Sequence, residues 1–191
     1  MTFEKDTTTL TAVNVATTYN VNKNLVTSLT DSQGNPLKGF NVTVDLNGAK
    51  TYTTNSNGQI IINIAKLVPK TYTAKLTFKG NDNYLNSAKN VKVTVKKAKP
   101  KIVAKKKTFK KSKKVKKYSI VLKDNRGKAI KKASVSIKVG KKTFKAKTNS
   151  KGKATFKLKK LTKKAKYKAK VTFKGDKYYN KVTKKVKITI K

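Results

Sequence analysis

The side chains in this sequence that could do chemistry are lysines, and the chemistry open to them is the binding of anions. Of the 191 residues, 50 are Lys or Arg and 7 are Asp or Glu, which gives a formal net charge of +43. The densest clusters lie in the second half, where closely spaced ammonium groups form a candidate site for a polyanion. These candidate polyanion-binding residues are Lys105, Lys106, Lys107, Lys110, Lys111, Lys113, Lys114, Lys116, Lys117, Lys159, Lys160, Lys163 and Lys164.

The composition excludes most other site chemistry. The chain has no Cys and no His, so it lacks thiolate metal ligands, cysteine nucleophiles, the usual general base and the commonest metal ligand. Ser and Thr are plentiful, but there is no histidine to activate one as a nucleophile. We therefore expect no catalytic residues, no cofactor and no metal site.

Two short motifs are weaker candidates. The run from Asn81 to Asn83 offers oxygen atoms, but Ca²⁺ takes about 6–8 oxygen ligands, and Asn and Asp side chains more often close turns. The aligned position in the second half is Asp176 followed by Lys177, which also favours a turn. Asn41, followed by Val and Thr, is a possible N-glycosylation site in a secreted chain, and we expect its side chain to be exposed.

The charge is unevenly distributed along the chain. Residues 1–97 hold 12 basic and 5 acidic side chains, whereas residues 98–191 hold 38 basic and 2 acidic ones. An asymmetry of this size points to a polyanionic partner for the second half. The candidate partners are nucleic acid, a membrane surface and an anionic cell-wall polymer.

Four sequence blocks occur twice, in the same order. Residues 29–34 (LTDSQG) match 122–127 (LKDNRG), and 54–58 (TNSNG) match 148–152 (TNSKG). Residues 76–80 (LTFKG) match 171–175 (VTFKG), and 91–95 (VKVTV) match 186–190 (VKITI). Such order indicates a duplication. We predict a moderately basic domain at residues 1–97 and a strongly lysine-rich domain at 98–191.

Apolar and polar residues alternate along most of each repeat, which predicts half-buried β-strands. The first repeat has expected strands near 9–13, 24–29, 40–46, 50–54, 59–64, 71–79 and 90–96. The second has them near 101–105, 117–122, 133–139, 142–147, 153–158, 165–173 and 184–190. Residues 161–169 also fit a helical spacing, but their counterpart in the first repeat alternates, so we predict a strand. The fold class is all-β, with two tandem immunoglobulin-like β-sandwich domains of about seven strands each.

The charge of the second repeat alone would predict disorder. Its apolar residues nevertheless keep the order of the first repeat, with Phe156 and Leu158 in the places of Ile62 and Ile64. We therefore predict a folded domain that is weakened by self-repulsion and loses stability in low salt.

Residues 72–87 (YTAKLTFKGNDNYLNS) and 167–179 (YKAKVTFKGDKYY) resemble a recurring block of the immunoglobulin-like repeats of prokaryotic cell-surface proteins. The turns at 31–37 and 124–130 are similar to the turn of that family before its third strand. In its lysine content the chain resembles adhesin-like proteins of methanogenic archaea. The resemblance implies a β-sandwich within a surface-displayed, multi-repeat chain, a spacer, adhesive or wall-associated role, and no catalytic residues.

We accordingly expect a cell-surface structural or adhesive module whose second repeat holds anionic wall polymer or an anionic partner surface, with other repeats of the same parent chain as possible neighbours. No apolar run approaches the roughly 20 residues of a transmembrane helix. Residues 1–6 lack the features of a signal peptide, so we expect a segment of a longer chain. The alternative is a non-specific nucleic-acid-binding protein, in which Phe109, Tyr118, Tyr178 and Tyr179 would stack on bases. The presence of a single Arg, Arg126, argues against it.

Overall fold

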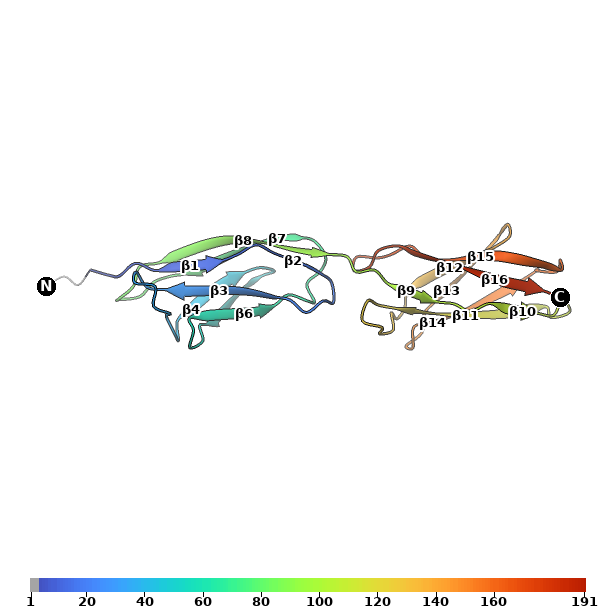
Figure 1. Cartoon of the computed structure of the whole chain (residues 1–191), viewed down its shortest axis with the longest axis horizontal. Helices are drawn as coiled ribbons and strands as arrows, with labels where there is room; N and C mark the ends of the chain where they lie inside the picture. The colour runs from blue at the N-terminus through green and yellow to red at the C-terminus, as the bar shows by residue number, and fades with distance from the viewer. Residues whose placement is uncertain (1–3) are drawn as a thin grey trace. The chain divides into compact units, whose positions relative to one another are not determined.

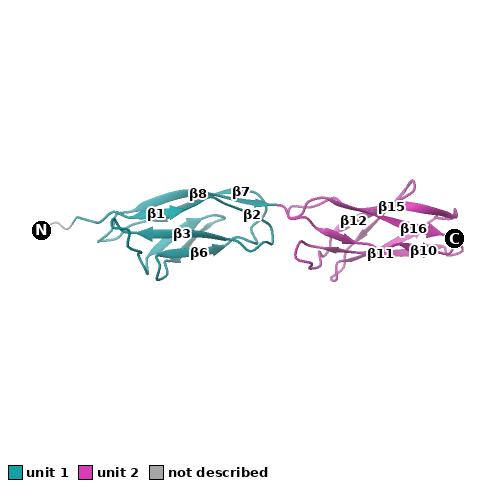
Figure 2. Ribbon diagram, viewed as in Figure 1, with its two compact units in different colours: residues 1–96 teal, residues 97–191 magenta. Residues whose placement is uncertain are grey.

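The computed structural model describes residues 4–191, which form two compact units (Figure 2). Unit 1 ends at Lys96, and unit 2 comprises Lys97–Lys191. The prediction that residues 1–6 are not a signal peptide falls partly on residues 1–3, which lie outside the described residues. Within residues 4–191 the chain forms sixteen β-strands and no helix (Figure 1).

In unit 1, two sheets form a sandwich. The strands are β1 (Thr9–Ala12), β2 (Val15–Thr18), β3 (Asn24–Thr30), β4 (Asn41–Asp45), β5 (Ala49–Thr53), β6 (Gln59–Asn63), β7 (Thr71–Phe78) and β8 (Ser87–Lys96). One sheet has the order β1-β3-β6 and the other has the order β2-β8-β7-β4-β5.

Unit 2 repeats this topology. Its strands are β9 (Lys101–Val103), β10 (Lys107–Phe109), β11 (Val115–Lys123), β12 (Ser134–Val139), β13 (Lys142–Lys147), β14 (Lys153–Lys159), β15 (Ala165–Phe173) and β16 (Val182–Ile190). The three-stranded sheet is β14-β11-β9, and the five-stranded sheet is β10-β16-β15-β12-β13.

Every strand range predicted from the sequence overlaps an observed strand, including β15, where a helix was the alternative. The prediction missed β2 and β10. In each unit the first predicted strand, β1 or β9, belongs to the three-stranded sheet. The chain then crosses to the five-stranded sheet, where β2 or β10 pairs in parallel with the last strand of the unit. A segment of three or four residues that changes sheets is too short to show a periodic pattern.

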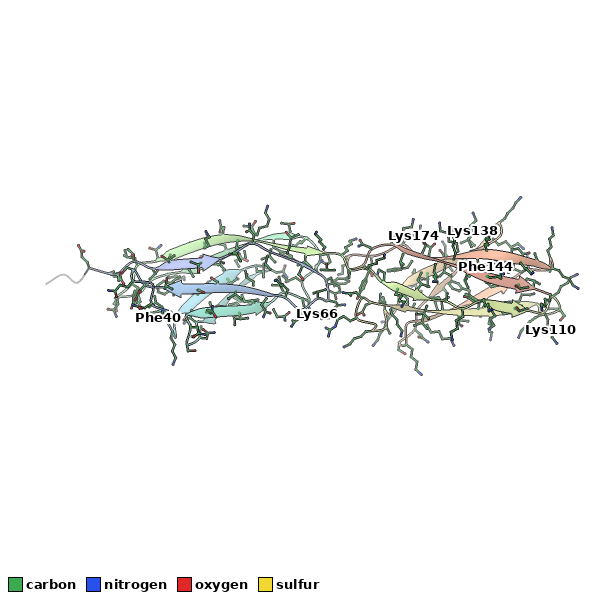
Figure 3. All side chains as sticks on the ribbon, in the orientation of Figure 1. Phe40, Lys66, Lys110, Lys138, Phe144 and Lys174 are labelled. Atoms are coloured by element: carbon green, nitrogen blue, oxygen red, sulfur yellow. The ribbon has the colours of Figure 1, made fainter. Side chains whose placement is uncertain are left out.

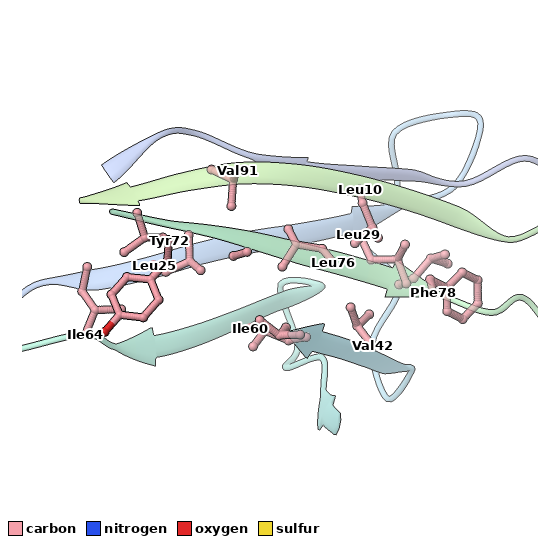
Figure 4. Close-up of a cluster of buried hydrophobic side chains, with 14 of the residues drawn as sticks. Leu10, Leu25, Leu29, Val42, Ile60, Ile64, Tyr72, Leu76, Phe78 and Val91 are labelled. Atoms are coloured by element: carbon pink, nitrogen blue, oxygen red, sulfur yellow. The ribbon is translucent and has the colours of Figure 1, made fainter. Parts of the chain in front are cut away.

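The core of each unit is formed by the inward-facing residues of both sheets. In unit 1, Leu25, Leu29, Val42, Leu76 and Phe78 pack in one buried cluster (Figure 4). In unit 2, Phe156, Leu158, Val171 and Phe173 are buried at the corresponding strand positions. Period-two alternation therefore builds the same kind of core in both units, whatever their surface charge.

Asn and Asp side chains hold the repeated turns, as predicted. The carboxylate of Asp31 accepts hydrogen bonds from the backbone N–H groups of Gln33 and Asn35, and Asp124 does the same for Arg126 and Lys128. The bond from the Asn35 side chain is the main reason that the pKa of Asp31 is lowered. These bonds fix the turns that precede β4 and β12.

The loop after β7, and its counterpart after β15, binds the segment that enters the same unit. In unit 1 the N–H of Asp6 donates to the carbonyl of Asn83, and the N–H of Leu85 donates to the carbonyl of Asp6. In unit 2, Ala98 makes the matching pair of backbone bonds, to Tyr178 and Asn180. The block that carries the family resemblance therefore anchors the start of its own domain.

Gly152 should be far less tolerant of substitution than Gly127, although both adopt a positive φ. A Cβ at Gly152 would lie 2.6 Å from the carbonyl oxygen of Leu122, whereas a Cβ at Gly127 would meet nothing within 4 Å. We expect Gly127→Ala to lower the free energy of unfolding by about 1–2 kcal/mol, because an L-residue is disfavoured at that φ. Gly152→Ala should cost at least about 1 kcal/mol more than that, because a backbone carbonyl must move. Urea unfolding of the two variants, followed in unit 2, measures the difference, and equal losses would contradict the expectation.

Candidate polyanion-binding surface

The two lysine clusters found in the sequence meet at one end of unit 2. The pairing of Val115 with Lys159 places the start of β11 beside the end of β14. Ile190 pairs with both Phe109 and Ala165, which places the end of β10 and the start of β15 at the same end of the sandwich. Loops 110–114 and 160–164 are therefore neighbours in space. We call this the lysine end, and Figure 3 shows Lys110 there.

Eight of the predicted residues belong to the lysine end, and all of them are exposed. They are Lys110, Lys111, Lys113, Lys114, Lys159, Lys160, Lys163 and Lys164. The β12–β13 turn joins them, because the ammonium of Lys142 donates to the carbonyl of Lys160. Loops distant in sequence thus combine into one cationic surface.

Four of the remaining candidates are exposed and lie outside loops 110–114 and 160–164. Lys105 and Lys106 lie between β9 and β10, where the chain changes sheets, and Lys107 opens β10. Lys117 lies on the outer face of the three-stranded sheet, directly opposite Lys157 on β14. Lys107 and Lys117 border the lysine end, because they line one hollow with Lys110 and Lys113, and the ammonium of Lys107 donates to the carbonyl of Lys117. Lys105 and Lys106 lie outside that hollow.

Lys116 corrects the prediction, because it is not a surface residue. Its side chain is 1% exposed. Its ammonium donates to the carbonyl of Lys113 at 2.6 Å and to that of Lys111 at 3.3 Å. Lys116 faces inward because it lies in phase with buried Tyr118 and Ile120 on β11. It holds loop 110–114 from inside and cannot contact a polymer.

The aromatic residues considered for base stacking are mostly buried. Phe109, Tyr118 and Tyr179 are buried, and Tyr178 is half-buried with the ammonium of Lys177 5.0 Å from its ring centre. Tyr118 donates from its hydroxyl to the carbonyl of Lys105, and burial raises its pKa. These rings stabilise the sandwich and offer no stacking platform for a row of bases.

Other candidate residues behave as turn or surface groups. The Oδ1 atom of Asn81 accepts from the N–H groups of Asn83 and Tyr84, and Asp176 holds the equivalent turn in unit 2. In the described part of the chain no three His, Cys, Asp or Glu side chains gather as metal ligands. Asn41 is exposed, as predicted, and its Oδ1 accepts from Thr53. Among residues 4–191 there is also no helix long and apolar enough to span a membrane.

The sequence-based search missed the lysines on the outer face of the five-stranded sheet. Lys138, Lys170 and Lys185 lie directly opposite one another on β12, β15 and β16. Lys168 and Lys187 form a second pair on the same face. Each of these lysines alternates with apolar residues along its strand, so only strand pairing reveals the row. The row could have been predicted by combining the alternation of lysine with apolar residues and the order in which the strands of this repeat pair.

The same row in unit 1 has a different composition. There Asp45 pairs with Lys75, which pairs with Asn90. A carboxylate and an amide thus flank one ammonium in unit 1, whereas three ammonium groups face one another in unit 2. Like charges directly opposite on adjacent strands are destabilising, by up to about 1 kcal/mol a pair.

Comparisons with known proteins support the fold. No family model and no curated protein matches the sequence. The structure is similar to that of invasin, a bacterial integrin-binding protein, with a TM-score of 0.55, 15% identity, and coverage of 94% of this chain and 39% of invasin. It is also similar to a multi-domain segment of titin, with a TM-score of 0.54, 13% identity, and coverage of 98% of this chain and 66% of that one. At these identities the likeness establishes the fold: the chain is all-β and consists of tandem immunoglobulin-like sandwiches.

Lys116→Ala and Lys117→Thr should have very different effects, although the residues are neighbours on β11. Loss of the buried Lys116 side chain leaves a cavity and removes two hydrogen bonds, so we expect the free energy of unfolding to fall by about 2–3 kcal/mol. Lys117→Thr should change it by less than about 0.5 kcal/mol, since Lys117 is exposed and opposite another lysine. Chemical denaturation of both variants tests this, and equal effects would mean that Lys116 does not hold loop 110–114.

The lysine row should make the stability of unit 2 depend on salt. We expect the midpoint of thermal unfolding of unit 2 to fall as salt drops from about 0.15 M to 0.01 M, where the screening length rises from roughly 8 to 30 Å. The variant K138D/K185N, which installs the residues of unit 1, should show a weaker dependence. Amide hydrogen exchange resolves the two units within the intact chain, and a salt-independent unit 2 would contradict the expectation.

Proposed function

We propose that this chain is a non-enzymatic, adhesin-like structural module of a cell-surface protein, in which unit 2 binds anionic cell-wall polymer or another anionic surface. The observation that carries the proposal is the contrast between two units of one fold. Unit 2 keeps the sandwich but carries nearly all of the excess lysine, on its loops and on both outer sheet faces. Unit 1, with its near-ordinary charge, acts as a spacer.

Binding through these lysines is a sum of many weak contacts. An exposed ion pair contributes about 0–1 kcal/mol, so affinity comes from the number of contacts. The lysine end and the sheet faces supply that number, and no deep, shaped cleft is required. The interaction is therefore salt-sensitive, and charge supplies most of its affinity.

The surface location is supported by two likenesses. The sequence resembles lysine-rich adhesin-like repeats such as those of methanogenic archaea, and the structure is similar in fold to invasin. The rival proposal, non-specific nucleic-acid binding, is disfavoured by the single Arg and by the burial of three of the four candidate stacking rings.

A salt-stepped pull-down of the intact chain tests the proposal. The chain is offered to purified cell-wall particles and, separately, to immobilised duplex DNA. Both interactions should weaken as salt rises, and contacts with 6–10 phosphates would lose about 10³–10⁵ in affinity between 50 and 200 mM salt. We expect DNA to release the chain at a lower salt step than the wall does, because the chain has a single Arg and three of the four candidate stacking rings are buried. Equal or better retention on DNA, with release from the wall at the same step, would overturn the proposal.

A matched pair of variants locates the binding unit. Replacing Lys110, Lys111, Lys163 and Lys164 with Ser should shift release from the wall to lower salt. Replacing the exposed Lys38, Lys50, Lys79 and Lys89 of unit 1 removes the same charge and should shift it much less. Equal shifts would show that net charge alone matters and would remove unit 2 from its assigned role.

A further inference from the structure

A groove lies on the outer face of the five-stranded sheet of unit 2, away from the lysine end. Its volume is about 630 Å³. Ser134 and Ser136 of β12 and Thr172 of β15 line its floor, and Lys145, Lys147 and Lys174 line its rim. Lys138 and Lys174 both project on this side of unit 2 (Figure 3). Hydroxyl groups and ammonium groups thus converge on one concavity.

Unit 1 has a groove over the equivalent strands, lined in part by Asn41, Thr43 and Thr51, but these polar groups bind within the sheet. There the hydroxyls of Thr43 and Thr51 are hydrogen-bonded across β4 and β5 at 3.3 Å. Thr53 donates to Asn41 at 2.9 Å in the same way. The side chains that line this groove are therefore largely satisfied within the sheet.

In unit 2, lysines replace the threonine partners. Lys145 stands opposite Ser136 and Lys147 stands opposite Ser134. The only polar group of a lysine side chain sits at the end of a long stem that extends into solvent, and neither Lys145 nor Lys147 reproduces the cross-strand bond of unit 1. Within residues 4–191, the hydroxyls of Ser134, Ser136 and Thr172 make no hydrogen bond to another protein group, and these residues are exposed or half-buried. Unit 2 therefore presents hydroxyls that bind no other protein group beside three ammonium groups.

We propose that this groove binds an acidic polysaccharide, a proposal that rests on the proposed function and identifies its ligand class and site. Lys145, Lys147 and Lys174 hold a carboxylate or sulfate of one sugar. The hydroxyls of Ser136 and Thr172, which both donate and accept, bind neighbouring sugar hydroxyls. The polymer continues over Lys138, Lys170 and Lys185. Lys138 lies two residues after Ser136 on β12, which is a distance of about 7 Å along the strand.

The chemistry of the groove disfavours other polyanions. A polyphosphate or nucleic-acid backbone offers almost only acceptors, so it would use the ammonium groups and leave the accepting capacity of the hydroxyls unfilled. None of the residues that line the groove is aromatic, so bases would have no ring on which to stack. A ligand that alternates hydroxyl and anionic groups matches both the hydroxyl and the ammonium groups of the lining.

The test measures binding of the intact chain to polygalacturonate, a carboxylated sugar polymer, and to polyphosphate at the same ionic strength. The variant S136A/T172V removes two hydroxyls and no charge. We expect it to bind polygalacturonate about tenfold more weakly, equivalent to two modest hydrogen bonds, and to bind polyphosphate within about twofold of the parent chain. No change for either polymer, or the same change for both, would overturn the proposal.

A second pair of variants separates the site from its charge. K145T/K147T restores the threonines of unit 1, and K101T/K123T removes the same charge from a cross-strand pair on the other sheet. We expect the first to weaken polygalacturonate binding at least several-fold more than the second. Equal losses of binding in the two variants would overturn the proposal that the groove is the binding site, but would leave the proposed wall binding standing. If the parent chain binds neither wall particles nor polygalacturonate at physiological salt, the proposed function fails as well.

Discussion

Two sheets packed face to face leave each strand residue only two directions, into the core or into water, and everything else in this molecule depends on that alternation. Because successive side chains point to opposite faces, the outward positions can change without disturbing the inward ones. In unit 2 the outward positions differ strongly from those of unit 1, while the inward positions stay apolar. Lysine occupies most outward positions of β12 to β16, yet Leu158, Val171 and Ile188 remain buried in the core. The long lysine stem can also lie along apolar surface while its ammonium stays in water.

The same alternation explains what the sequence could and could not predict. Strands, turns and the duplication are local or repeated features, so they were predictable from 191 residues alone. The short strands β2 and β10 were missed because they are defined by pairing in the other sheet rather than by their own pattern. Lys116 was assigned to the surface because runs of lysine hide the phase of a strand, and only its alignment with Tyr118 and Ile120 shows that it points inward. The row at Lys138, Lys170 and Lys185 comes from strands far apart in sequence, so clustering along the chain could not detect it.

Charge concentrated in this way opposes the stability of the fold that carries it. Repulsion across the lysine row acts at the centre of a sheet, where the backbone cannot move apart without losing its ladder of hydrogen bonds. Unit 1 shows that the fold does not require such a row, since Asp45 and Asn90 occupy the outer positions there. The proposed function would account for a feature that opposes the stability of the domain and that folding does not require. An anionic polymer lying across the row would supply the missing counter-charge, so binding and the stability of unit 2 are linked.

Because the chain holds two copies of one fold, comparing them distinguishes the effect of added charge from the effect of lost cross-strand hydrogen bonds. The exchange of Thr51 and Thr53 for Lys145 and Lys147 adds charge and, in the same step, removes the cross-strand hydrogen bonds that the two threonines make. Added charge alone would make unit 2 a polycation that accepts any anion. Released hydroxyls alone would make a weak polar groove like many on β-sheet surfaces. Their coincidence in one concavity gives unit 2 directional groups beside its charge, and directional hydrogen bonds are what allow a cationic surface to distinguish one polyanion from another.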